Sequence, residues 1–296
     1  MRKVIGIFIV LLVAVTSQAE ETIRLFMIGN SFSENTTRYL REIAAADGCK
    51  VEVRIANIGG GSMEDHWGGV REHQRDPQKG KLYAGRSLQE MLKSEKWDVV
   101  TIQQRSATSA KLETYRPHAK NLYDFIKTNA SQAEVRMHQT WAYRADDTGY
   151  TGGYSQKDMH EAIRKNFHTI AGELGVTIIP VGEAFAKVRT YPEWMFKRDP
   201  NFDYAHPVSP NLPDESRSLN IGARWKAEKF WVDTHHASPL GEYLGSAVFF
   251  EALFGKSVVG NSFVPAGISA EDVAFFQQIA HDIMTDEKNI NPQVSR

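Results

Sequence analysis

Residues 23–33 read IRLFMIGNSFS, and this stretch sets the expectation for the whole fold. Its first six residues are mostly apolar and predict a short, buried strand, which a glycine follows at once. The chain then passes through Ser31 into residues 33–46, whose apolar side chains recur at helical spacing. A strand that leads directly into a helix is the unit from which parallel sheets are built.

Strand and helix patterns continue to alternate along the chain. Four further apolar runs predict strands at residues 51–56, 97–103, 135–139 and 176–181, with amphipathic helical patterns between them. This alternation predicts one parallel sheet that is covered by helices and joined by right-handed crossovers. Ligand sites in such sheets lie in loops beyond the carboxyl ends of the strands, so functional residues should follow strands directly.

Two regions interrupt this rhythm. Residues 57–86 are rich in glycine, histidine and charge, and residues 187–231 carry five prolines and several aromatic side chains without clear periodicity. Loops of this length in a compact domain are usually functional or disordered. Because of its aromatic residues, we expect the excursion at 187–231 to be ordered and to form one wall of a substrate cleft.

The bulk composition is that of an ordinary globular protein. The chain has 296 residues, 42% of them hydrophobic and 24% charged, with a formal net charge of −1. No basic cluster marks a nucleic-acid partner. Cys49 is the single cysteine, so no internal disulfide can form, and we expect a buried structural thiol.

The first 19 residues are typical of a cleavable signal peptide. Arg2 and Lys3 precede an apolar run at 4–15, and Ser17-Gln18-Ala19 ends in a small-x-small pattern. The run is shorter than the ~18 residues of a membrane-spanning helix, and no cysteine follows it for lipid attachment. The sequence therefore predicts a secreted or periplasmic protein without a membrane anchor, with a single domain over residues 20–296.

Two short motifs carry residue types suited to chemistry. Ser31 follows the first strand at a helix start, where free backbone amides could stabilise an oxyanion, although Ser31 or Ser33 could instead simply cap the helix. Far downstream lies Asp233-Thr234-His235-His236. An aspartate three residues before a histidine can orient the imidazole as a base, while a metal site is the alternative for such a cluster.

Together these fragments resemble the SGNH (GDSL-like) hydrolase superfamily. The resemblance implies a three-layer α/β/α sandwich with a five-stranded parallel, flavodoxin-like sheet. It also implies that Ser31 is the nucleophile, Asp233 the orienting carboxylate and His236 the base, with His235 contacting loop backbone or substrate. Asn30 stands where the family usually has aspartate, a position outside the triad.

The same resemblance suggests which groups would hold the oxyanion. Besides the amide of Ser31, the family uses a glycine amide after the second strand, for which Gly60 and Gly61 are both candidates here. The family's third block often carries an asparagine, but this chain has Gln103 and Gln104 at the corresponding strand end. A glutamine amide offers the same N–H donor, so we expect Gln103, or else Gln104, to take this role.

Around this site we expect a sugar-binding surface. Trp141 and Tyr143 follow the fourth strand, and their flat rings would suit a sugar as well as the core. The sequence thus predicts a serine esterase that needs no cofactor and removes acyl groups from a small-molecule or glycan ester, in an unknown oligomeric state. The alternatives are a carbohydrate-binding protein, a metal site on His235 and His236, or a glycosidase that uses loop carboxylates such as Glu64, Asp65, Asp146, Asp147 and Asp203.

Overall fold

The central element of the fold is a five-stranded parallel sheet. The computed structural model describes residues 21–147, 149 and 152–290, so the expected signal segment at 1–19 lies outside the described residues. The strand order is β2-β1-β3-β4-β5, the flavodoxin-like order, which confirms the predicted fold class. The strands are β1 (Glu21–Gly29), β2 (Cys49–Asn57), β3 (Val99–Ile102), β4 (Glu134–His138) and β5 (Thr177–Ile179).

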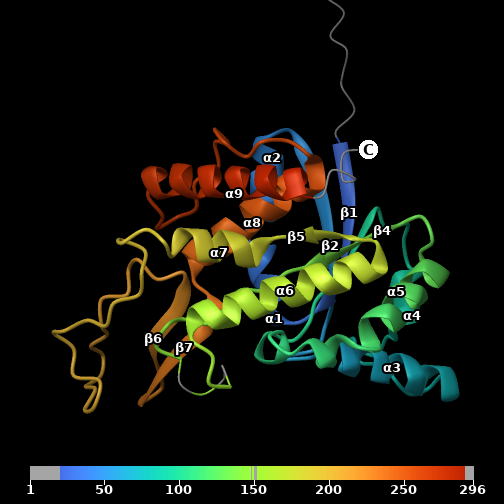
Figure 1. Ribbon diagram of the computed structural model, residues 1–296, viewed down its shortest axis with the longest axis horizontal. Helices are drawn as coiled ribbons and strands as arrows, with labels where there is room; N and C mark the ends of the chain where they lie inside the picture. Colours follow the sequence, from blue (N-terminus) through green and yellow to red (C-terminus); the bar gives the residue numbers. More distant parts are fainter. Residues whose placement is uncertain (1–20, 148, 150–151, 291–296) are drawn as a thin grey trace, which may run out of the picture.

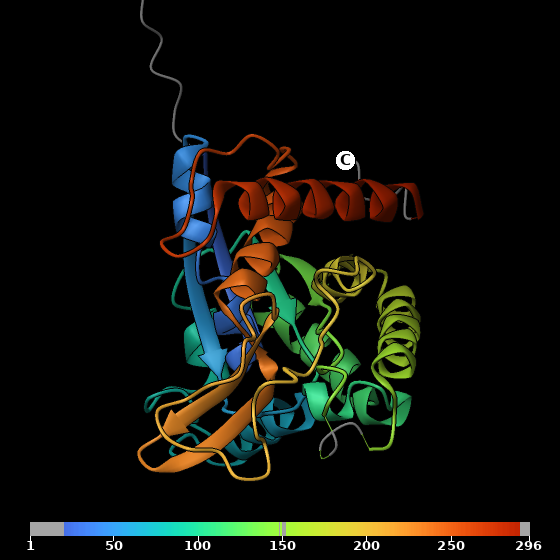
Figure 2. The same cartoon turned by 90° about the vertical axis from the view of Figure 1, so that its left-hand side faces the viewer.

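Helices cover both faces of this sheet (Figures 1 and 2). On one face lie α1 (Ser31–Thr36), α2 (Leu40–Ala46) and α8 (Pro239–Phe254), and α7 (Val181–Val188) and α9 (Ala270–Ile290) pack against α8. The other face carries α3 (Met63–Arg75), α4 (Leu88–Leu92), α5 (His118–Asn129) and α6 (Gln156–Leu174). None of the helices in the described part of the chain is both long and apolar enough to cross a membrane.

The helix predicted at 33–46 is in fact two helices. It begins earlier, at Ser31, because the side chain of Asn30 accepts the amide of Phe32 at 3.0 Å and caps α1. Neither Ser31 nor Ser33 is the cap. The first helix ends at Thr36, where consecutive β-branched threonines bond back to carbonyl oxygens of the preceding turn.

The glycine-rich region at 57–86 is more regular than its composition indicates. It contains the thirteen-residue helix α3, which starts with a capping box between Ser62 and Asp65. Gly68 and Gly69 weaken the helical signal in the sequence. A Cβ at Gly69 would lie 2.5 Å from the end of the Leu82 side chain, which is 44% exposed and would have to turn aside.

The excursion at 187–231 was expected to be ordered although its sequence lacks clear periodicity, and from Asn220 onward it forms regular strands. An antiparallel hairpin of β6 (Asn220–Lys226) and β7 (Lys229–Ala237) forms a separate two-stranded sheet beside the carboxyl ends of the parallel strands (Figure 2). Its turn includes Ala227 with φ of 54°, a conformation that usually requires glycine or asparagine. The usual sequence signal for a tight hairpin is therefore missing.

Candidate active site

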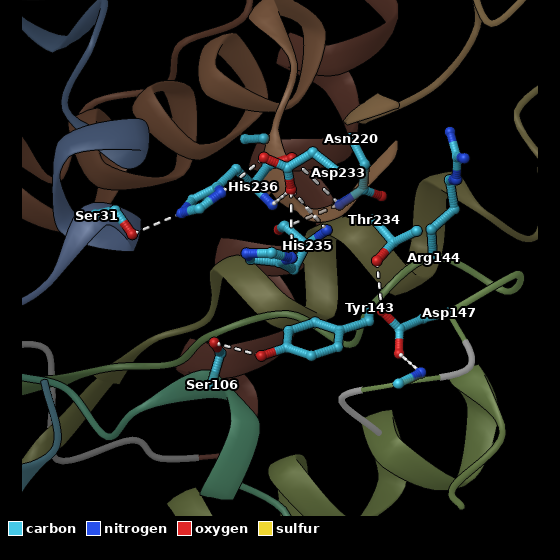
Figure 3. Close-up of polar contacts among 12 residues, drawn as sticks. Ser31, Ser106, Tyr143, Arg144, Asp147, Asn220, Asp233, Thr234, His235 and His236 are labelled. Carbon is cyan, nitrogen blue, oxygen red and sulfur yellow. Dashed lines mark hydrogen bonds and ion pairs between the residues drawn. The ribbon is translucent and has the colours of Figure 1, made fainter. Parts of the chain in front are cut away.

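Ser31 lies where β1 ends and α1 begins, and its hydroxyl faces a histidine from the hairpin. The distance from Ser31 Oγ to His236 Nε2 is 2.8 Å, although 205 positions separate the two residues (Figure 3). The end of β7 is also tied to α1, since the amide of Ala237 donates to the side chain of Asn35 at 3.3 Å. The topology thus brings the two predicted chemical motifs into direct contact.

Asp233 fixes the orientation of this histidine. Its Oδ2 lies 2.9 Å from His236 Nδ1, and its Oδ1 accepts the backbone amides of His235 and His236 at 3.2 and 3.0 Å. Because an ionised carboxylate only accepts hydrogen bonds, Nδ1 carries the ring proton and Nε2 is left to accept the proton of Ser31. This is the tautomer that a base needs in order to activate a serine.

The pKa shifts of Asp233 and His235 fit an ionised carboxylate beside the His236 ring. Burial alone would raise the pKa of Asp233, but the hydrogen bonds from His236 and the nearby His235 outweigh it and hold that pKa well below its usual value. Burial lowers the pKa of His235, an effect that Asp233 partly offsets. Asp233 therefore stays ionised beside His236 across the neutral range.

Trp141 has a different role from the one expected. Its side chain is fully buried, stacked between Phe32 at 4.2 Å and Phe185 at 4.5 Å between ring centroids, so it presents no face to a sugar. The indole N–H donates to the carbonyl of His235 at 2.8 Å. Trp141 thus joins the residue after Ser31 to the residue before His236 and holds the two motifs in register.

Tyr143 is also buried rather than exposed to substrate. Its hydroxyl is 2.8 Å from the hydroxyl of Ser106, and its ring lies 5.4 Å from that of His235 (Figure 3). His235 is the more accessible of these two predicted contact residues, with its side chain 20% exposed. The expectation of an aromatic sugar platform at 141–143 is therefore wrong, because these rings complete the core beneath the site.

The glycine loop after β2 contains both candidate amides for the oxyanion, those of Gly60 and Gly61, and their hydrogen bonding differs. Asn57 pairs with Gly29 in the sheet, so this loop starts beside the turn that carries Ser31. The amide of Gly61 donates to the carbonyl of Ile58 at 2.8 Å and is not available to a ligand. Gly60 has φ of 62°, and within the described part of the chain its amide has no hydrogen-bond acceptor.

The two glutamines after β3 are engaged elsewhere. The Gln103 amide nitrogen donates to Asn30 Oδ1 at 2.6 Å, and its oxygen accepts the Ser33 hydroxyl at 2.7 Å. The Gln104 nitrogen donates to the carbonyl of Thr114 at 2.7 Å. Both side chains are buried, which argues against the expected oxyanion role. Gln103 instead holds the turn that carries Ser31, since it contacts residues on both sides of that serine.

Behind this turn lies a histidine whose contact the sequence did not indicate. His66 Nε2 is 3.0 Å from the carbonyl of Gly29, and His66 Nδ1 is 2.7 Å from the Tyr83 hydroxyl. A carbonyl only accepts, so Nε2 carries the proton and Nδ1 accepts from Tyr83. Burial lowers the pKa of His66 to about 4, which keeps it neutral. His66 is therefore a packed histidine with both ring nitrogens hydrogen-bonded, and it is not part of the candidate catalytic group.

The metal and glycosidase alternatives can also be placed. Asp233, His235 and His236 offer ligand atoms within 4.8 Å of one another, a set that could hold a metal ion. A metal on His236 Nδ1 would replace the proton shared with Asp233, so the two arrangements exclude each other. The loop carboxylates suggested for a glycosidase mostly serve the fold: Asp65 caps α3, Asp146 pairs with Arg144 at 2.7 Å, Asp203 accepts amides of its own loop, and Asp147 bonds the Thr234 hydroxyl.

Comparison with known proteins places this architecture in a family. A crystal structure of a DUF4886 family protein from Bacteroides uniformis is 26% identical with a TM-score of 0.71, covering 90% of this chain and 95% of that one. A proposed SGNH hydrolase from Slackia heliotrinireducens is 22% identical with a TM-score of 0.50, over 78% of this chain and 98% of that one. The fold is therefore that of the SGNH hydrolases. No curated protein matches the sequence.

The family model for a domain of unknown function, DUF4886, matches residues 24–206. The match spans more than half of the chain and includes Ser31, but it ends before the hairpin that carries Asp233 and His236. The chain belongs to the DUF4886 family.

Proposed function

We propose that the protein is a serine esterase in which Ser31, His236 and Asp233 form a catalytic triad. One observation carries the proposal. A serine hydroxyl, both nitrogens of one imidazole and a buried carboxylate lie in a continuous hydrogen-bonded row, with contacts of 2.8 and 2.9 Å. Such a row lets the imidazole take the serine proton while the carboxylate stabilises the imidazolium that results.

The reaction proceeds in two steps. His236 Nε2 takes the proton of Ser31 as Oγ attacks the ester carbonyl, and the same nitrogen then protonates the departing alcohol. Water, deprotonated by His236, next attacks the acyl-serine and releases the acid. As the acid leaves, His236 returns the proton taken from water to Ser31 Oγ, so one imidazole carries the proton in both steps.

The oxyanion of each tetrahedral intermediate is held by backbone amides. As the first residue of α1, Ser31 keeps its amide outside the helical hydrogen-bond pattern. Gly60 supplies the second amide, because that of Gly61 is already used within its own loop. Gln103 contributes indirectly, by fixing Asn30, whose side-chain nitrogen donates to the carbonyl of Gly61 at 3.0 Å.

The proposed substrate is an acylated carbohydrate, most simply an O-acetylated glycan, met after export of the protein to the periplasm or beyond. This part of the proposal is supported by the signal-like residues 1–19 and by the aromatic content of the excursion. Any binding face for the sugar must lie outside Trp141 and Tyr143, since both rings are buried.

The test is covalent labelling with a fluorophosphonate, followed by peptide mapping. We expect the adduct on Ser31 and on no other serine, and we expect hydrolysis of p-nitrophenyl acetate to disappear in Ser31→Ala. Ser33→Ala is a matched control for the labelling, because Ser33 lies two residues away with its hydroxyl bound to Gln103. Turnover that survives in Ser31→Ala, or activity that a chelator abolishes, would favour the metal arrangement instead.

A further inference from the structure

An arginine lies immediately beyond the triad carboxylate. Nη2 of Arg224, on β6, is 3.4 Å from Oδ2 of Asp233, on β7. The Asp233 side chain has no exposed surface, whereas that of Arg224 is 41% exposed. In the described part of the chain, Asp233 is the one polar partner of this guanidinium. Arg224 thus places a positive charge at the Asp233 end of the row Ser31, His236, Asp233, and this charge faces solvent.

Asp233 does not need this arginine to be satisfied. Its oxygens already accept the ring proton of His236 and two backbone amides at 2.9–3.2 Å, all shorter than the contact with Arg224. A cation beside a triad also opposes the imidazolium that forms during catalysis. A guanidinium has five N–H donors, and only Nη2 of Arg224 contacts Asp233. Most of the Arg224 donors therefore have no hydrogen-bond acceptor within the described part of the chain.

Trp231 holds this cation in place. Arg224 and Trp231 are register partners in the hairpin, so their side chains lie on the same face of the two-stranded sheet. The guanidinium carbon lies 4.2 Å from the indole ring centroid, a cation–π contact that restricts the arginine. The Trp231 side chain is itself 40% exposed, one of the large apolar groups that the fold leaves uncovered.

We propose that Arg224 and Trp231 form a substrate subsite that selects sugar esters carrying a carboxylate. The planar guanidinium matches a carboxylate with two parallel hydrogen bonds, and an indole presents a flat apolar surface to a sugar ring. Arg224 lies at the other end of the row from Ser31, with His236 and Asp233 between them, so the proposed substrate carries its acid group some distance from the ester that Ser31 attacks. This inference rests on the proposed esterase function and adds the charge of the substrate.

The test compares two esters that differ only in the acid group: acetylated methyl galacturonoside and acetylated methyl galactoside. We expect the wild-type protein to prefer the acidic ester about tenfold in kcat/KM, the size of a partly exposed charge-assisted contact. In Arg224→Gln the ratio of the two values should fall to about one, and 0.5 M salt should reduce it in the wild type. Arg54→Gln is the control, because Arg54 is similarly exposed but pairs with Glu95 away from the site.

Two results would overturn this subsite. The first is equal activity on both esters in the wild-type protein. The second is an equal loss on both esters in Arg224→Gln, which would mean that Arg224 acts through Asp233 rather than on substrate. Either result leaves Ser31-dependent hydrolysis of p-nitrophenyl acetate in place, whereas failure of Ser31 labelling would refute the esterase function itself.

Discussion

Replacing His138 by leucine should make the protein markedly more resistant to acid. This histidine ends β4, is fully buried against Phe249, and neither ring nitrogen has a hydrogen-bond partner in the described part of the chain. Burial lowers its pKa to about 3 from an ordinary value of 6.5. Unlike His236, whose ring nitrogens contact Ser31 and Asp233, His138 is a neutral polar group buried in the core without a hydrogen-bond partner among the described residues.

The size of the effect follows from linkage. Between pH 6.5 and about 3 the unfolded chain binds a proton at this histidine and the folded chain does not, so stability falls as the pH falls through this window. Each pH unit costs about 1.4 kcal/mol, and lowering the pH from 6.5 to 5 costs about 2 kcal/mol. His138→Leu removes this loss, and at neutral pH it also removes an unsatisfied polar group that costs about 1–3 kcal/mol.

The assay is urea unfolding followed by tryptophan fluorescence at pH 7.5, 6 and 5. We expect the free-energy difference between His138→Leu and the wild-type protein to grow by about 2 kcal/mol over this range. His206→Gln is the control, because the His206 side chain is 85% exposed and should leave the pH dependence almost unchanged. If His138→Leu and wild type lose stability in parallel, His138 is not a neutral, unpartnered group and the reasoning fails.

Three further substitutions test the triad and its supports. Asp233→Asn should lower kcat for p-nitrophenyl acetate by about 10⁴ with KM little changed, since the amide favours the wrong imidazole tautomer; a loss under tenfold would contradict the triad. Trp141→Phe keeps the stacked ring but loses the bond to the His235 carbonyl, so thermal unfolding should show a loss of about 1 kcal/mol together with a lower kcat. Gly60→Ala, at φ of 62°, should lower the free energy of unfolding by about 1–2 kcal/mol and reduce kcat for p-nitrophenyl acetate by a factor of up to about 10². Gly59→Ala is the control: its φ is not positive, so neither quantity should change.

The parallel sheet could be predicted because its signal is local. Each strand is a short apolar run followed by a turn or a helix start, and all five predicted strands are present. The position of Ser31 at the ligand-binding edge of the sheet was also predictable, because it follows the end of β1. Its pairing with His236 was implied only by the resemblance to the SGNH hydrolases. The hairpin was not, since Ala227 occupies a turn position where glycine or asparagine would have signalled it.

The side chains around the serine were harder to assign because their roles depend on distant partners. Trp141 looks the same in sequence whether it faces a sugar or the core. Its burial depends on Phe185 and on the docking of β7. Gln103 likewise has the donor that an oxyanion needs, but Asn30 and Ser33, some 70 positions away, already occupy its amide. Local sequence patterns identify side chains with a suitable ring or hydrogen-bond donor, but they do not show which distant residue that side chain will contact.

The 205 positions between Ser31 and His236 also separate the two residues in time. At typical rates of synthesis, roughly 10–40 s pass between the addition of the serine and the addition of the histidine. During that interval the growing chain holds the Ser31 hydroxyl without the His236 imidazole that lies beside it in the folded protein. Under the proposed function, the order of residues along the chain leaves the growing polypeptide without its base until 236 of its 296 residues have been added.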